Sequence, residues 1–203
     1  MVNSKKITLI MTGASGAAYG LRLLEALVKA DCQIYLLLSR PAHIVIKMET
    51  DLALPMRASE IEVFFTKKYQ AKAGQIRVFE KEQWLAPIAS GTGVADATVV
   101  CPCTTGTLSS IAVGSSKNLL ERAADVALKE RKKLILVIRE TPFSEIHLEN
   151  MLKLSRMGAV IMPANPGFYF KPESLTEIVD FMVARILDQL NIEHSLQASW
   201  GAD

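Results

Sequence analysis

The chain has 203 residues, half of them apolar, and its 23 Lys and Arg nearly balance its 21 Asp and Glu. This length and composition predict one compact domain over residues 1–203 with a full hydrophobic core. The net charge of +2 argues against a nucleic-acid binder driven by bulk charge. No apolar run reaches the roughly 18 residues of a membrane span.

Cysteines and histidines give no sign of a metal site. The three cysteines, Cys32, Cys101 and Cys103, are odd in number and lack the spacing of a zinc knuckle. His43, His147 and His194 share no ligand-like spacing either, so we read all three as structural. No signal-peptide pattern precedes the first strand. We therefore expect buried free thiols in a cytoplasmic protein that needs no metal.

Apolar runs of strand length alternate with amphipathic helical stretches along the chain. Because the strands are continuously apolar rather than alternating, they predict a parallel sheet covered on both faces, an α/β fold. The expected strands are 5–12, 33–38, 76–79, 97–101, 134–138 and 159–162. The expected helices are 16–30, 41–49, 59–72, 105–113, 117–130, 144–157 and 174–190.

Small, hydroxyl-bearing or charged residues follow four of these strands. Right-handed crossovers bring the carboxyl ends of parallel strands to one edge, where ligands bind. Backbone N–H groups at helix starts, hydroxyls and an Arg together suit the binding of a phosphate. In any one loop, Gly, Ser and Thr would be explained by their ordinary occurrence in turns. The residues are Gly13, Ala14 and Ser15, then Ser39, then Thr104, Thr105, Gly106 and Thr107, then Arg139 and Glu140.

The first loop limits the class of phosphate-containing ligand that the chain is expected to bind. Residues 13–20 contain no Lys, which argues against a nucleoside triphosphate loop. Glycines at 13, 16 and 20 do not fit the dinucleotide pattern Gly-x-Gly-x-x-Gly. Ser39 and Arg40 stand where an NAD-binding acid is expected, so NADP stays open through Arg40. A single terminal phosphate fits the loops better.

Three long segments are similar to a known family. They are MTGASGAAYGLRLLEAL, CPCTTGTLSSIAVG and NLLERAADVALKERKKLILVIRETPFSEIHLENMLKLSRMGAVIMPANPGFY. They resemble the UbiX/Pad-type flavin prenyltransferases, from about residue 5 to Trp200. The resemblance implies a Rossmann-like, flavodoxin-type three-layer fold and a homododecamer built of trimers. It implies transfer of a dimethylallyl group from dimethylallyl phosphate to N5 and C6 of reduced FMN, without a metal. The product would serve a UbiD-type decarboxylase, commonly in ubiquinone biosynthesis.

The resemblance also implies roles for individual residues. FMN would be bound by Gly13, Ala14, Ser15, Ser39, Thr104, Thr105, Gly106, Thr107, Arg122 and Arg139. Dimethylallyl phosphate would be bound by Lys129, Tyr169 and Arg185. Catalytic roles would fall to Ser15, Glu49, Lys129, Glu140 and Trp200, with the tail 191–203 closing the site. Helical phase further predicts a partly buried Arg185. The segment Ser90–Gly93 departs from the Ser-Gly-Ser of many members.

Two other functions remain alternatives. One is an FMN-dependent decarboxylase of the same superfamily, whose Pro-x-Met-Asn motif is replaced here by Pro163-Ala164-Asn165-Pro166. The other is a non-catalytic FMN carrier for a decarboxylase. A carrier has no use for a second phosphate site, so the transferase is favoured by Lys129, Glu140, Tyr169 and Arg185.

Overall fold

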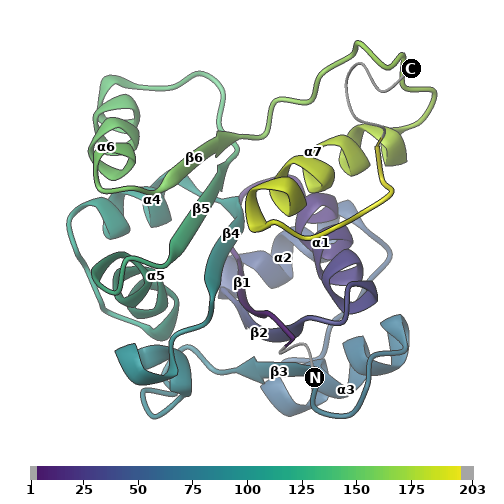
Figure 1. The fold of residues 1–203 in the computed structure, drawn as a ribbon, viewed down its shortest axis with the longest axis horizontal. Coiled ribbons are helices and arrows are strands. Elements are labelled where there is room, and N and C mark those ends of the chain that lie inside the picture. Colours follow the sequence, from purple (N-terminus) through teal and green to yellow (C-terminus); the bar gives the residue numbers. More distant parts are fainter. Residues whose placement is uncertain (1–3, 198–203) are drawn as a thin grey trace.

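Six parallel strands form one sheet in the computed structural model, which describes residues 4–197 (Figure 1). They are β1 (Lys6–Met11), β2 (Gln33–Leu38), β3 (Ile76–Phe79), β4 (Ala97–Cys103), β5 (Lys133–Ile138) and β6 (Val160–Pro163). The order across the sheet is β3-β2-β1-β4-β5-β6. This is the Rossmann order, which reverses between β1 and β4 and places a ligand crevice there. The predicted parallel α/β sheet is confirmed.

Helices cover both faces of the sheet and complete the three layers of a single-domain fold (Figure 1). One face packs against α1 (Ala17–Lys29), α2 (Arg40–Glu49), α3 (Ala58–Tyr69) and α7 (Leu175–Leu190). The other packs against α4 (Thr105–Ala112), α5 (Leu119–Lys129), α6 (Glu145–Arg156) and the 3-10 turn η1 (Pro87–Ala89). A second 3-10 turn, η2 (Gly91–Gly93), follows η1. Helical periodicity does not signal either of these short turns.

Short polar side chains fix where most of the helices begin. Ser39, Thr104, Asn118, Ser144 and Ser174 each accept a hydrogen bond from a backbone N–H of the first turn. These caps start α2, α4, α5, α6 and α7 within two residues of the predicted positions. Helix ends are less predictable. The helix expected to reach residue 72 ends at Tyr69, because Gln70 takes a left-handed conformation with φ 53°.

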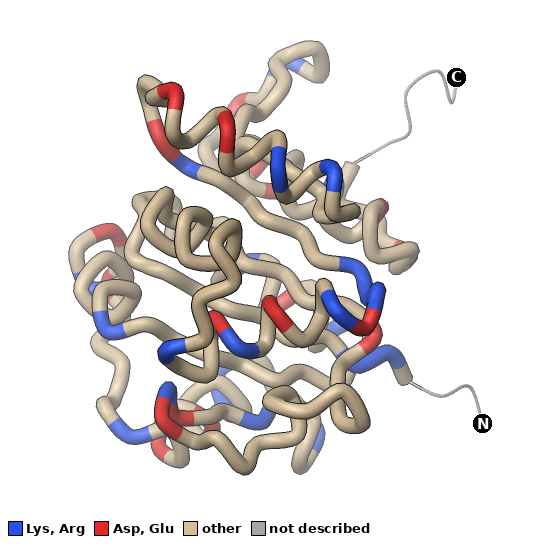
Figure 2. The backbone as a smooth tube through the Cα atoms, turned by 90° about the vertical axis from the view of Figure 1, so that its left-hand side faces the viewer, with Lys and Arg blue, Asp and Glu red and all other residues tan. Residues whose placement is uncertain are grey.

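The hydrophobic core is continuous along the two central strands. Every β4 residue is buried, as are the last five of β1. Among residues 4–197, no helix is long and apolar enough to cross a membrane. Figure 2 shows basic and acidic residues interleaved along the chain, as the balanced composition predicts.

Replacing Leu9 tests the packing of this core. Leu9 is fully buried on β1. We expect Leu9→Ala to lower the free energy of unfolding by about 3–5 kcal/mol, because it leaves a cavity between β1 and the helices on one face of the sheet. Leu9→Met keeps the volume and should cost less than about 1.5 kcal/mol. Urea unfolding followed by circular dichroism measures both. Equal losses in the two variants would contradict the tight packing described.

Candidate functional site

Thr12 ties the ends of β1 and β4 together where the strand order reverses. Its buried hydroxyl donates to the Pro102 carbonyl at 2.8 Å and accepts from the Thr104 N–H at 2.9 Å. The start of α4 is thereby fixed beside the loop that follows β1. Sequence reasoning did not single out Thr12, although a polar residue directly after a buried apolar strand is a usable signal.

The loop from Gly13 to Gly16 runs close against the start of α2. A Cβ atom at Gly13 would lie 2.3 Å from the Cβ of Pro41, so this position needs glycine. The N–H groups of Gly16 and Ala17 donate to the Glu49 Oε2 at 2.9 and 2.8 Å. We expected the helix-start amides to face a phosphate. Instead, these two amides of α1 bind a carboxylate of the chain itself.

The same contacts set the charge state of Glu49. Burial raises the pKa of this carboxyl, but hydrogen bonds from Ser15, Ala17 and Gly16 act against it. The positive charge of Arg139 adds to them, so that the pKa lies below its usual value. Glu49 is therefore a carboxylate at neutral pH. The contribution of Arg139 also shows that the loop after β5 lies near the loop after β1.

Hydroxyls after β2 and β4 also act as helix caps. The Ser39 side chain accepts from the Ala42 N–H at 3.2 Å. The Thr104 hydroxyl accepts from the Thr107 N–H at 3.1 Å and donates to the Thr107 Oγ1 at 2.9 Å. Turn chemistry thus explains part of what these residues do. Because a hydroxyl both accepts and donates, the O–H groups of Ser39 and Thr107 can still donate to a ligand.

Arg139 and Glu140 follow β5 at the same edge. The Thr105 hydroxyl lies 3.5 Å from the Glu140 Oε2, which links the loops after β4 and β5. The Arg139 Nε is buried and has no hydrogen-bond partner among residues 4–197. A buried guanidinium nitrogen in this condition needs an acceptor, such as an anion or a carbonyl group of a ligand.

Arg122 and Lys129 form a separate cluster. They lie seven residues apart and therefore share a face of α5. Arg122 donates to the Ala89 carbonyl at 3.1 Å and pairs with Asp125 at 2.8 Å. Lys129 pairs with Glu130 and lies so close to Gly91 that a Cβ there would be 3.1 Å from its Nζ. The segment Ser90–Gly93 thus belongs to this cluster.

A single chain does not bring Lys129 to Ser15 and Glu140. Lys129 ends α5 just before the amino end of β5, whereas Glu140 follows the carboxyl end of that strand. The six residues of β5 span about 20 Å at ~3.3 Å per residue. The prediction of one reacting centre is therefore not met within one chain. A motif shows which residues a site uses, but not whether one chain supplies them.

Tyr169 and Arg185 lie on a third part of the molecule. Residues 164–174 leave the sheet after β6 and return to begin α7 (Figure 1). Phe170 stacks on Phe181 of α7 with ring centroids 5.5 Å apart, which holds this segment to the helix. The side chain of Tyr169 is exposed. Trp200 lies outside the described residues.

Arg185 corrects one prediction. Its side chain is 52% exposed rather than partly buried, and it pairs with Asp188 at 2.7 Å. The buried face of α7 is formed by Met182, Val183, Ile186 and their neighbours one turn on, so Arg185 lies outside it.

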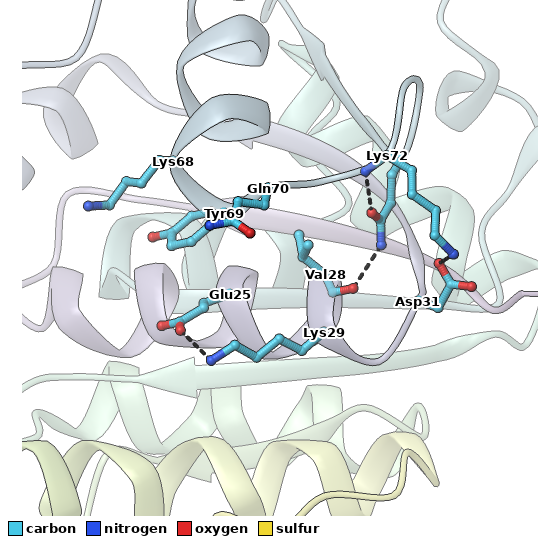
Figure 3. Close-up of a pocket in the computed structure, with 9 residues that line it drawn as sticks. Glu25, Val28, Lys29, Asp31, Lys68, Tyr69, Gln70 and Lys72 are labelled. Atoms are coloured by element: carbon cyan, nitrogen blue, oxygen red, sulfur yellow. Dashed lines mark hydrogen bonds and ion pairs between the residues drawn. The ribbon is translucent and has the colours of Figure 1, made fainter.

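A cavity of about 550 Å³ lies away from all three groups, between the ends of α1 and α3 (Figure 3). Four of its charged groups already pair with one another, Lys29 with Glu25 and Lys72 with Asp31, both at 2.7 Å. The residues predicted to bind FMN, apart from Arg122, instead follow β1, β2, β4 and β5 at one edge of the sheet.

Comparison with known proteins identifies the family. The family model described as Flavoprotein matches residues 1–187. Flavin prenyltransferase UbiX of Pseudomonas aeruginosa is 56% identical over 201 residues, covering 99% of this chain and 96% of the relative. The chain belongs to the UbiX flavin prenyltransferase family. The family resemblance read from the sequence is confirmed.

Solved structures of UbiX-type proteins share the fold. One is AnUbiX (PadA1) in complex with FMN and dimethylallyl pyrophosphate, 38% identical with a TM-score of 0.86, covering 98% of this chain and 99% of that one. Another is a dodecameric FMN-dependent UbiX-like decarboxylase from Escherichia coli O157:H7. It is 40% identical with a TM-score of 0.84 and covers 97% of this chain and 100% of that one.

The contacts of Glu49 predict a dependence of stability on pH. Because its pKa is lowered in the folded chain, its stabilising contribution is complete above the unfolded value of 4.5 and is lost as the pH falls further. We expect Glu49→Gln to lower the melting temperature at neutral pH. The difference from the wild type should shrink as the pH falls from about 7 to about 3.

Melting curves of both proteins across this range give the measurement. Glu60→Gln, at an exposed position in the first turn of α3, is the matched control. A Glu49→Gln difference that stays constant over the whole range would contradict the charged contact.

Proposed function

We propose that this protein joins a dimethylallyl group from dimethylallyl phosphate to N5 and C6 of reduced FMN and releases prenylated FMN. The observation that carries the proposal is the 56% identity, over nearly the whole chain, to a relative named flavin prenyltransferase. A related structure, with a TM-score of 0.86, holds FMN together with dimethylallyl pyrophosphate. Under this proposal the chain needs two anion sites, one for each phosphate.

The residues at the open edge fit FMN. The loops after β1, β2, β4 and β5 meet there, and glycine at position 13 keeps the first loop close to α2. The buried Arg139 Nε lacks an acceptor among the described residues, and the hydroxyls of Ser39 and Thr107 can donate. Residues 4–197 hold no group of three or more metal-binding side chains.

When bound, reduced FMN supplies the electron-rich N5 and C6 positions to which the allyl group is joined. The chain must then stabilise phosphate as it leaves the allylic carbon with growing negative charge. Arg185, Lys129 and the Tyr169 hydroxyl are the donors we assign to it, since charge-assisted hydrogen bonds strengthen as charge develops. We assign Trp200 to the wall that faces the allylic carbon.

The two carboxylates take different roles in this proposal. Three donors and the charge of Arg139 lower the pKa of Glu49, which makes it a weak base. We therefore assign Glu49 to holding the loop and Ser15, which orients the N5 edge. We assign Glu140 to accepting the proton released from C6.

We also propose that different copies of the chain complete one site. Lys129 lies at the amino end of β5, whereas Glu140 follows its carboxyl end and is linked there to the loop after β4. Two unlike surfaces that meet between copies make a head-to-tail interface, which closes into a ring. The related Escherichia coli protein is described as dodecameric, which supports a homododecamer here.

The remaining parts of the proposal concern the cellular setting. We assign a UbiD-type decarboxylase as the acceptor of prenylated FMN, with ubiquinone biosynthesis as its use. A reducing cytoplasm agrees with the three cysteines, which are all buried and free. The chain would be one domain, its tail 191–203 closing the site.

Mass spectrometry of the flavin tests the reaction. The purified protein is mixed anaerobically with reduced FMN and dimethylallyl phosphate, and the flavin is then extracted. We expect a flavin heavier by one five-carbon unit, and an unchanged mass when the donor is omitted. An unchanged mass with the donor present would favour one of the alternatives, an FMN-dependent decarboxylase or an FMN carrier. Two of the related structures are named decarboxylases.

Mixed variants test the shared site. Ser15→Ala and Lys129→Ala chains with different tags are coexpressed, and assemblies holding both are purified. Each variant alone should be nearly inactive. The mixture should recover about a quarter of wild-type activity, because a quarter of random pairings unite an intact Ser15 with an intact Lys129. No recovery would contradict the proposal that two chains share one site.

A further inference from the structure

We propose that Asp188 is a positioning residue for Arg185, and that His194 holds Asp188 in turn. This inference rests on the proposed function, in which Arg185 binds the phosphate of the prenyl donor. The two oxygens of Asp188 take one partner each. Arg185 NH1 donates to Oδ2 at 2.7 Å, and His194 Nε2 lies 3.0 Å from Oδ1.

The backbone fixes which nitrogen of His194 carries the proton. The Leu196 N–H points to the His194 Nδ1 at 3.4 Å. A backbone N–H can only donate, so Nδ1 is the acceptor and the proton of the neutral ring lies on Nε2. Nε2–H therefore donates to Asp188. The His194 side chain is 13% exposed and that of Asp188 is 44% exposed, so the imidazole is the sheltered partner of this pair.

Packing holds His194 in position. Asn191 ends α7 in a left-handed conformation with φ 50°, and the chain then turns back along the helix. Ile192 is buried in the core, and Leu196 packs against the same cluster. The residues on either side of His194 are thus anchored, and the imidazole gives Asp188 a fixed partner on the protein side.

Arg185 needs such a partner to be ready for an anion. It is a long side chain on an exposed helix face, and its rotamers must be restricted before it can bind phosphate with defined geometry. Because its guanidinium has five N–H donors in a plane, one edge can bind Asp188 while the other faces phosphate. An exposed ion pair three residues apart adds little to stability, so orientation is the larger effect of this contact.

The arrangement also joins two parts of the proposed site. The segment that carries His194 leads directly into the tail with Trp200. Arg185, Asp188 and His194 therefore tie the donor-phosphate residue to the root of that tail.

Binding of dimethylallyl phosphate to protein loaded with oxidised FMN tests the inference, since no transfer can occur in that complex. Isothermal titration gives the Kd. We expect Asp188→Ala to weaken donor binding about tenfold, because Arg185 loses its orienting acceptor. Asp188→Asn keeps one acceptor oxygen for Arg185 but has no second acceptor oxygen for His194. We expect this variant to weaken the binding of dimethylallyl phosphate about threefold. His194→Ala should match Asp188→Asn. The Kd for FMN should change less than about twofold in all three.

Lys72→Ala is the matched control, because it breaks an exposed ion pair of the same 2.7 Å length, with Asp31, that includes no residue of α7. It should leave both Kd values unchanged. The inference is overturned if the wild type does not bind the donor, if Asp188→Ala binds it as tightly as the wild type, or if Asp188→Asn binds as weakly as Asp188→Ala. A wild type that binds the donor but makes no heavier flavin would overturn the proposed function alone.

Discussion

The Thr12 hydroxyl joins the carboxyl ends of two neighbouring strands, through a bond to Pro102, which lies 90 positions further along the chain. It accepts from the start of one helix and donates to the end of the neighbouring strand, within a buried place where an unmade hydrogen bond is costly. The strand order reverses at this point, so helices diverge to opposite faces and leave an opening. The loop of Ser15, the cap of α4 and the Arg139–Glu140 pair all border that opening, and their relative positions depend on this contact.

The fold was largely readable from the sequence, because local patterns set it. The strands Gln33–Leu38 and Ile76–Phe79 have the predicted bounds, since polar or charged residues follow the apolar residues of each strand directly. The starts of α2, α4, α5, α6 and α7 agree with the prediction within two residues, and a capping residue lies next to each of them in sequence. The end of α3 was not, because the left-handed conformation of Gln70 has no clear signal in a residue of that type. Both 3-10 turns were missed for a related reason, since three residues are too few to show a period.

The candidate site was readable only in part. Residues that follow strands could be placed at one edge from topology alone. The contact of Glu49 with Gly16 and Ala17 joins residues more than 30 positions apart, and no local sequence pattern predicts it. The separation of Lys129 from Ser15 was equally hidden, because sequence similarity reflects the complete site and not the chain that supplies each part. Arg185 lies next to the boundary between the buried and the exposed face of α7. The prediction placed it on the buried side, whereas its side chain is exposed.

Glu49 gives the loop after β1 a property that phosphate-binding loops usually lack. In a loop that relies on its ligand for a counter-charge, the backbone N–H groups at the helix start have no acceptor before the ligand binds. Such a loop tends to change conformation on binding. Here two of those amides are met by a side chain from α2, so the loop has its shape before any flavin enters. Under the proposed function, flavin binding at this loop is not offset by the entropy of ordering the segment.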